Sequence, residues 1–323
     1  MGNVTADWTW RLREDTAVWE AKARGSYGYR ASNTAVFALT GAGVTALGFG
    51  IGGDAWGWLV LAAFAVTLAA GLAVMFGASR FVAASLLNIW FIIALGSAFS
   101  SHHSAHVASY TWAYVLAWAG GSALWIAVTF SAWLTRGRRD WPRLFAELPT
   151  DASRRKLTPP LITFALLRAI AIAITVALAF GLDLSHGSWM PIAAIVAMKP
   201  SLEQAAVTAI QRLAGALIGA GAAALLLLVP ASEHGQQLSA ADHGLEVVAL
   251  VLLMHAVAVF FWNYALFSGS LAAAALILVD LPHPSNYAAD GYRVLWTLCG
   301  VGIGVLVMLL ADLLAKRTAT RQA

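Results

Sequence analysis

Long apolar runs separated by short polar stretches make up most of the chain, and all but one run are long enough to cross a lipid bilayer as a helix. A bilayer core of about 30 Å needs about 20 apolar residues, because a helix rises about 1.5 Å per residue. The pattern therefore predicts an all-α, polytopic transmembrane bundle of about ten segments. These segments lie at 35–53, 57–77, 80–99, 110–134, 161–183, 188–199, 210–230, 245–262, 264–281 and 293–315.

The composition excludes an ordinary soluble protein. Of the 323 residues, 60% are hydrophobic and only 11% are charged, whereas soluble domains carry roughly 25% charged residues. The formal charge of +4 would suggest a nucleic-acid partner for a soluble chain. Here, however, cations gather in a polar linker at 135–160, which the positive-inside rule places in the cytoplasm. The expected partner is the lipid bilayer, and nucleic-acid binding is not expected.

The basic linker divides the chain into two membrane blocks. A four-helix block at 35–134 precedes the linker, and a six-segment block at 161–315 follows it. The distribution of lysine and arginine places both termini inside the cell. Residues 1–34 are expected to form a cytoplasmic segment, either an interfacial helix or an ordinary extension, and residues 316–323 a cytoplasmic tail.

Two pairs of residues suggest an internal repeat. Arg30 precedes the first segment as Arg212 precedes the main part of the seventh, and Tyr110 opens the fourth segment as Tyr292 opens the last. Both offsets are 182 residues (212 − 30 and 292 − 110). Two parallel repeats of four and six segments explain this register and imply a pseudo-twofold axis along the membrane normal. A coincidence of hydropathy spacing is the alternative explanation.

The stretch from Ser188 to Gly221 holds the one interrupted segment. Its first apolar run, Trp189 to Met198, is too short to span a bilayer, and Pro200 cannot continue the helical ladder. Broken helices leave backbone groups free at membrane depth, where only protein or a water-filled cavity can cover them. The sequence therefore predicts a binding feature here, and leaves open whether the segment spans the membrane or is re-entrant.

The same stretch resembles the fusaric acid resistance (FUSC) family and the related aromatic acid exporters, over roughly Arg168 to Leu314. Ala216 stands where that family has threonine. The resemblance implies a bacterial inner-membrane exporter of aromatic or other amphipathic carboxylates. The residues that carry the resemblance are Trp189, Pro191, Lys199, Pro200, Arg212, Gly215 and Gly219.

Three cations around the break are the candidate substrate-binding residues, together with Trp189. Arg168 lies inside its segment, while Lys199 and Arg212 lie on either side of Pro200. An arginine offers a carboxylate a planar two-pronged donor and a lysine offers a point charge. The structural alternative is that Lys199 and Arg212 reach the cytoplasmic headgroups, and that Glu203 pairs with Lys199 across one helical turn.

The remaining candidates are structural or concern proton coupling. Pro191 and Pro200 shape the broken helix, and Gly215 and Gly219 are expected to allow close helix packing. His255 lies at depth in an apolar segment, where an imidazole could couple proton entry to export or could be a packed neutral side chain. No metal or cofactor is expected, because the histidines at 102, 103 and 106 have no neighbouring cysteine or carboxylate to complete a site.

These observations predict an inner-membrane secondary exporter of aromatic or other amphipathic organic acids, driven by the proton motive force. No nucleotide-binding loop and no hydrolase motif of the common forms occurs, so an enzyme is not expected. One alternative is a passive organic-anion channel, since the chain also resembles the plant aluminium-activated malate transporters. The other is a non-transporting membrane scaffold. A periplasmic adaptor or a second copy of the chain is a further expected partner.

Overall fold

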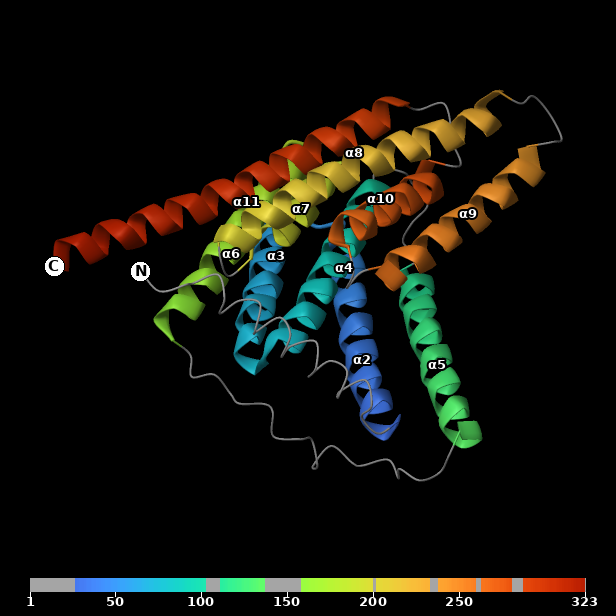
Figure 1. The fold of residues 1–323 in the computed structure, drawn as a ribbon, viewed down its shortest axis with the longest axis horizontal. Coiled ribbons are helices and arrows are strands. Elements are labelled where there is room, and N and C mark those ends of the chain that lie inside the picture. Colours follow the sequence, from blue (N-terminus) through green and yellow to red (C-terminus); the bar gives the residue numbers. More distant parts are fainter. Residues whose placement is uncertain are drawn as a thin grey trace. The chain divides into compact units, whose positions relative to one another are not determined.

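The computed structural model describes residues 27–102, 111–136, 158–199, 202–232, 238–259, 263–280 and 287–322, and within these ranges the chain is helical with no strand (Figure 1). Each of the ten apolar segments corresponds to one α-helix, which confirms the all-α prediction for this part of the chain. A short 3-10 turn, η1 (Ala73–Phe76), follows the second helix. The helices are α2 (Tyr27–Ile51), α3 (Trp56–Leu72), α4 (Ala78–His102), α5 (Thr111–Arg136), α6 (Pro159–Gly181), α7 (Trp189–Ala197), α8 (Leu202–Ser232), α9 (Leu238–Val259), α10 (Tyr264–Asp280) and α11 (Tyr287–Gln322).

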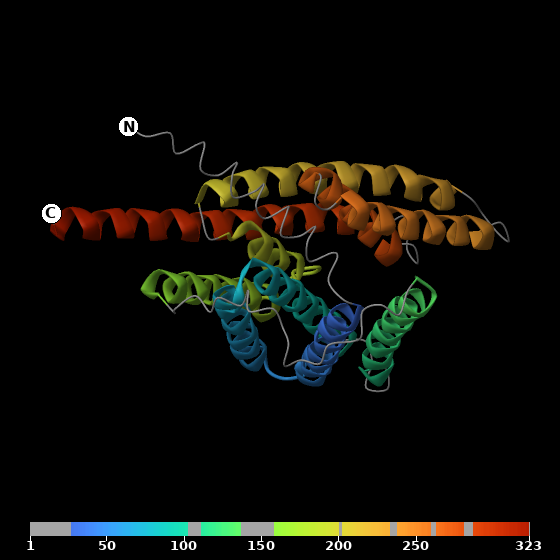
Figure 2. The same cartoon turned by 60° about the horizontal axis from the view of Figure 1, so that its bottom comes forward.

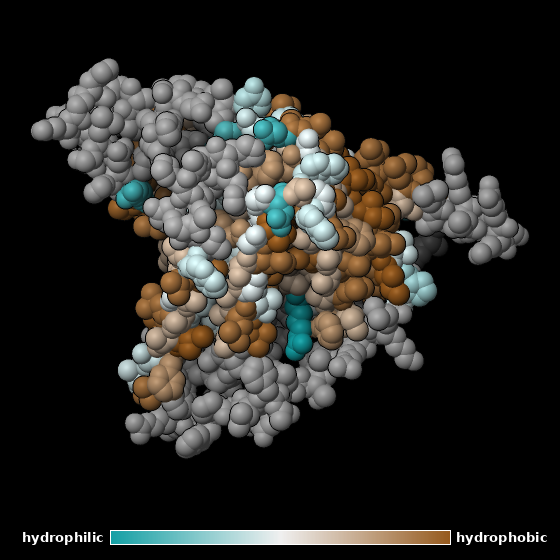
Figure 3. All heavy atoms as spheres, turned by 180° about the vertical axis from the view of Figure 1, so that it is seen from behind, coloured by the Kyte–Doolittle hydropathy of each residue, from teal (hydrophilic) through white to brown (hydrophobic). Residues whose placement is uncertain are grey.

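The helices present an apolar surface suited to lipid. Large side chains such as Leu39 and Met254 are 76% and 72% exposed, and hydrophobic residues predominate on the described face in Figure 3. The inward orientation of the termini and the two parallel repeats stay predictions. Within the described ranges, six stretches are long and apolar enough to cross a membrane, namely Thr34–Ile51, Trp56–Phe76, Arg80–Ser100, Leu161–Gly181, Ala205–Leu227 and Gly291–Leu313.

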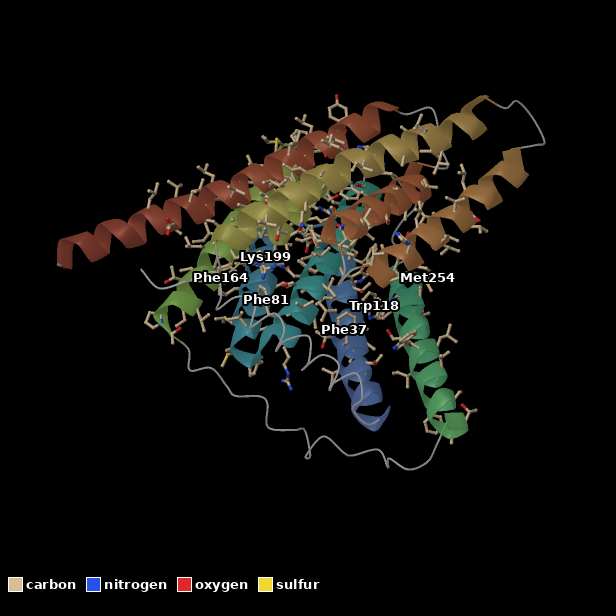
Figure 4. The ribbon with its side chains drawn as sticks, viewed as in Figure 1. Phe37, Phe81, Trp118, Phe164, Lys199 and Met254 are labelled. Atoms are coloured by element: carbon tan, nitrogen blue, oxygen red, sulfur yellow. The ribbon has the colours of Figure 1, made fainter. Side chains whose placement is uncertain are left out.

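Contacts between helices divide the chain into two units. The first unit contains α5 and most of α2, and the second contains the end of α2 with all the other helices. The predicted four-helix block at 35–134 therefore contributes to both units, and the block boundaries stay predictions. Within the first unit, the indole N–H of Trp118 donates to the carbonyl of Ala38 at 3.0 Å. Figure 4 shows the same ring facing Phe37, with 5.9 Å between ring centroids.

Glycine and alanine residues set the helix spacing in the second unit. A Cβ atom added at Gly48 of α2 would lie 2.9 Å from Cβ of Ala94 in α4, and one added at Gly71 of α3 would lie 2.9 Å from Cβ of Ala165 in α6. Such contacts are the main source of helix association in lipid, where burying apolar surface gains little. The small residues therefore fix which helix faces meet.

Close contacts between small residues also join α8 to α10. A Cβ at Gly215 would lie 2.7 Å from that of Ser268, and one at Gly219 would lie 2.8 Å from that of Ala272. Gly221, by contrast, faces open space. The two helices run side by side in both ribbon views (Figures 1 and 2), and their contact register brings the first half of α10 beside the middle of α8.

The short helix α7 is enclosed by protein. Nearly all its residues from Met190 onward are buried, and α11 lies against its backbone through two glycines. Gly300 faces the carbonyl of Met190, and a Cβ at Gly304 would lie 3.2 Å from Cγ of Met198. Because the glycines are four residues apart, both lie on one face of α11, and this face fixes the position of the half-helix.

Replacing Gly300 by alanine should push α11 away from α7. We expect Gly300→Ala to lower the free energy of unfolding by about 1 to 3 kcal/mol, the usual cost of overpacking, as measured by titration with sodium dodecyl sulfate. Gly302→Ala is the matched control, because Gly302 is exposed and a Cβ there meets nothing within 4 Å. Equal stabilities of the two variants would contradict the proposed α7–α11 contact.

Candidate functional site

The end of α7 leaves backbone carbonyls without helical partners. The helix has only nine residues, and the backbone of Met198 is already extended, with φ −78° and ψ 109°. Pro191 is tolerated because it lies in the first turn, where an N–H would have no helical acceptor. Before the start of α7, the indole N–H of Trp296 in α11 donates to the carbonyl of Ser185 at 2.8 Å. This hydrogen bond connects the loop before α7 to α11. Pro200 lies outside the described residues.

Arg168 of α6 satisfies one of those carbonyls. Its side chain is only 1% exposed, and Nη2 donates to the carbonyl of Ile195 at 3.4 Å and to Oγ of Ser85 at 3.1 Å. The last carbonyls of a helix carry partial negative charge, so a guanidinium there is favourable. Arg168 thus holds the end of the half-helix α7 against α4 and α6.

Lys199 and two aromatic rings complete this group of residues. Lys199 is close enough to Arg168 for their positive charges to repel one another. The guanidinium carbon of Arg168 lies 5.0 Å from the ring centroid of Phe81, which in turn lies 6.2 Å from that of Phe164. We call Arg168, Lys199, Ser85, Phe81 and Phe164 the half-helix site.

The cations of the half-helix site lack a counter-charge among the described residues. Lys199 and Arg168 form no ion pair with a carboxylate among the described residues. Nε and Nη1 of Arg168 are buried and have no hydrogen-bond partner in the described part of the chain. Burying an unpaired charge is costly. The arrangement therefore suits an anion that brings both negative charge and acceptor atoms.

Arg212 belongs to a different group of contacts. It is 6% exposed, and its Nη1 donates to Oγ of Ser268 on α10 at 3.3 Å. Tyr264 lies one helical turn before Ser268 on the same face of α10. Arg212 is therefore held between α8 and α10 and does not extend to the surface. The described contacts bring Arg168 and Lys199 together, whereas those of Arg212 lead to α10.

The other sequence candidates lie at different positions. Trp189 is half-buried at the start of α7, and His255 is exposed on α9, next to buried Ala256. Asn263, expected as a turn residue, caps α10, since its side-chain oxygen accepts the N–H groups of Ala265 and Leu266 at 3.0 and 3.1 Å. The side chains of the histidines at 102, 103 and 106 lie outside the described residues.

Sequence reasoning missed one buried cation. Arg293 was not among the sequence candidates, and it is 3% exposed inside α11. A periodic signal could have revealed it, because Thr297, Gly300, Val301 and Gly304 continue its buried face at helical spacing. Ser85 and Ser268 had no such signal, since single serines in apolar segments are common packing residues.

Comparison with known proteins adds one match. Residues 170–307 match the family model described as fusaric acid resistance protein-like. The matched range begins in α6, two residues after Arg168, contains Lys199 and Arg212, and ends in α11. No curated protein and no solved structure matches the chain.

Removing the charge of Lys199 should stabilise the anion-free protein. In Lys199→Met the repulsion with Arg168 and the desolvation of an ammonium group disappear, so we expect a gain of roughly 1 kcal/mol or more in the free energy of unfolding. Arg80→Met removes an exposed cation of α4 and should change little. Both are measured at low ionic strength without added organic acid. A destabilised Lys199→Met would mean that this ammonium group has a structural partner.

Proposed function

Through residues 170–307 the chain belongs to the fusaric acid resistance protein-like family, and from this premise we propose that it exports aromatic or other amphipathic organic acids. The family and the apolar helices identify a multi-pass membrane protein of a transporter family. We place it in the bacterial inner membrane, where export would be driven by the proton motive force. A periplasmic adaptor or a second copy of the chain is the partner we propose for it.

The observation that carries the proposal is the uncompensated charge at the end of α7. Arg168 keeps two donor nitrogens without partners in the described part of the chain, and Lys199 adds a second cation beside it. A charged side chain within a membrane costs about 2.5 to 3.5 kcal/mol on insertion scales. A bound carboxylate would offset that cost and would accept hydrogen bonds from the guanidinium.

The aromatic rings favour an acid with an apolar body. Phe81 and Phe164 lie in one buried cluster with Met198 and Met308, directly beside the cations. A carboxylate held by Arg168 and Lys199 would therefore direct its ring or hydrocarbon part toward apolar and aromatic side chains. Ring contacts of this kind add about 0.5 to 1.5 kcal/mol beyond area burial. This combination supports amphipathic acids over small inorganic anions.

Arg168 also offers a way for binding to cause movement. Its Nη2 holds the carbonyl of Ile195 at 3.4 Å, which is a long hydrogen bond. A carboxylate would compete for the same guanidinium and would weaken the attachment of α7 to α6. Since a ligand shifts a conformational equilibrium only by binding one state better, this competition would favour the state in which α7 is released. Movement of the two repeats about the broken helix would then expose the acid to the other side.

Flux measurements test the anion site. In proteoliposomes with an imposed pH gradient, we expect the wild-type protein to transport labelled hydroxybenzoate and fusaric acid. Arg168→Gln should reduce the initial rate by about tenfold or more, as expected for a lost charge-assisted hydrogen bond. Arg80→Gln, a change at an exposed cation, is the control and should transport normally.

Other flux results would contradict the proposal in specific ways. Flux that ignores the gradient would indicate a passive channel. The absence of flux from protein that elutes as a single folded species would favour the scaffold alternative or an obligate partner. Normal flux in Arg168→Gln would remove the half-helix site from the mechanism.

His255 is the group we propose for proton coupling. Its imidazole is exposed on α9, and histidine side chains are common proton carriers in proteins. We expect His255→Ala to lose gradient-driven accumulation while exchange of internal for external acid continues. Met254→Ala changes a neighbouring side chain that is 72% exposed and should keep both activities. Normal accumulation by His255→Ala would mean that protons are coupled elsewhere.

A further inference from the structure

We propose that Arg212, Ser268 and Tyr264 form a second carboxylate-binding site, separate from the half-helix site and used by the same transported acid. The inference rests on the proposed function for the identity of the anion, but it stands on different residues. Arg212 belongs to α8, and Ser268 and Tyr264 belong to α10. We call these three residues the α8–α10 site.

Burial and missing counter-charge mark the α8–α10 site. Arg212 is 6% exposed, and its Nε is buried without a hydrogen-bond partner among the described residues. Among the described residues, its hydrogen bond goes to a neutral hydroxyl, that of Ser268, at 3.3 Å. The described side chains of α8 and α10 include no carboxylate. A guanidinium in this setting retains donor capacity and positive charge for an incoming anion.

The two hydroxyls would complete the donor set. Tyr264 and Ser268 are four residues apart on α10, so both lie on one helical face, and Ser268 meets Arg212 of α8 there. Each O–H can donate a hydrogen bond to a carboxylate oxygen while the guanidinium supplies the charge. Tyr264 is only half-buried, and Asn263 before it is exposed. The start of α10 is therefore the side from which an anion can reach the site.

Close helix contact keeps this site in place. One turn after Arg212, a Cβ at Gly215 would lie 2.8 Å from the backbone nitrogen of Gly269. The backbones of α8 and α10 therefore meet directly beside Ser268, and the hydroxyl cannot move away from Arg212 without separating the helices. A donor set built on two helices in direct contact is preorganised, which lowers the cost of ordering it around a ligand.

Arg212 is separated from the half-helix site along α8. Lys199 precedes the first residue of α8, Leu202, and Arg212 lies ten residues beyond Leu202. At about 1.5 Å per residue that is roughly 15 Å along the helix. The two groups of cations are therefore distinct positions, and the binding stoichiometry can separate them.

Binding stoichiometry of the purified full-length protein tests the inference. With labelled benzoate in equilibrium dialysis, we expect two sites per chain in the wild-type protein and one in either Arg212→Gln or Arg168→Gln. Ser268→Ala keeps a small residue in the helix contact, and should weaken one of the two sites by about tenfold while leaving the other unchanged. Thr175→Val is the matched control, because the Thr175 hydroxyl is buried and bonds only within α6, to Ile172, at 2.9 Å.

The outcomes separate this inference from the proposed function. One site per chain that is lost in Arg168→Gln but kept in Arg212→Gln overturns the α8–α10 site and leaves the exporter proposal standing. No saturable binding in the folded wild-type protein overturns both. If Arg212→Gln does not fold, unchanged affinities in Ser268→Ala and Tyr264→Phe overturn the site. A separate measurement with labelled chloride tests whether the α8–α10 site binds carboxylates. If chloride binds once per chain and this binding is lost in Arg212→Gln, while benzoate fills only one site, the assignment of a carboxylate to this site is overturned.

Discussion

The structure depends on covering the polar end of a helix that is too short to cross a membrane. The carbonyls at the end of α7 cannot be left in lipid, and Arg168 reaches from α6 to that of Ile195. Gly300 and Gly304 let α11 lie against the backbone of the same helix. These contacts put a buried guanidinium beside Lys199 and two phenylalanine rings, so the requirement that secures the broken helix also creates the half-helix site.

The helices pack through small residues, as expected for helices in lipid, and large apolar side chains contribute less to these contacts. Apolar side chains gain little from leaving lipid for protein, so large ones remain outside and small ones mediate the contacts. Some glycines meet a specific partner helix, namely Gly48 of α2, Gly71 of α3, Gly215 and Gly219 of α8, and Gly300 and Gly304 of α11. Others, such as Gly221 and Gly302, face open space. The register of the helices, and with it the position of each buried cation, is therefore decided by where glycine and alanine recur.

Arg168 and Arg212 show how a charge can be kept in such a bundle. Each donates to neutral oxygen atoms and retains donor nitrogens that the described residues do not use. An arginine fully paired with a carboxylate would avoid the cost of an unpaired buried charge, but it would keep no free donor for an anion. Incomplete pairing costs stability and retains binding capacity, which is the usual balance at a functional site.

The sequence by itself determined the class of the protein, the number of helices, and the break after Met198. Hydrophobic runs and a proline are local signals, and the bilayer turns run length directly into a span. It also indicated Arg168, Lys199 and Arg212 as unusual, because charge inside an apolar run is visible without coordinates. Only the tertiary structure separated them into two groups and added Ser85, Ser268 and buried Arg293, since which helix faces meet is decided by contacts between residues far apart in the chain.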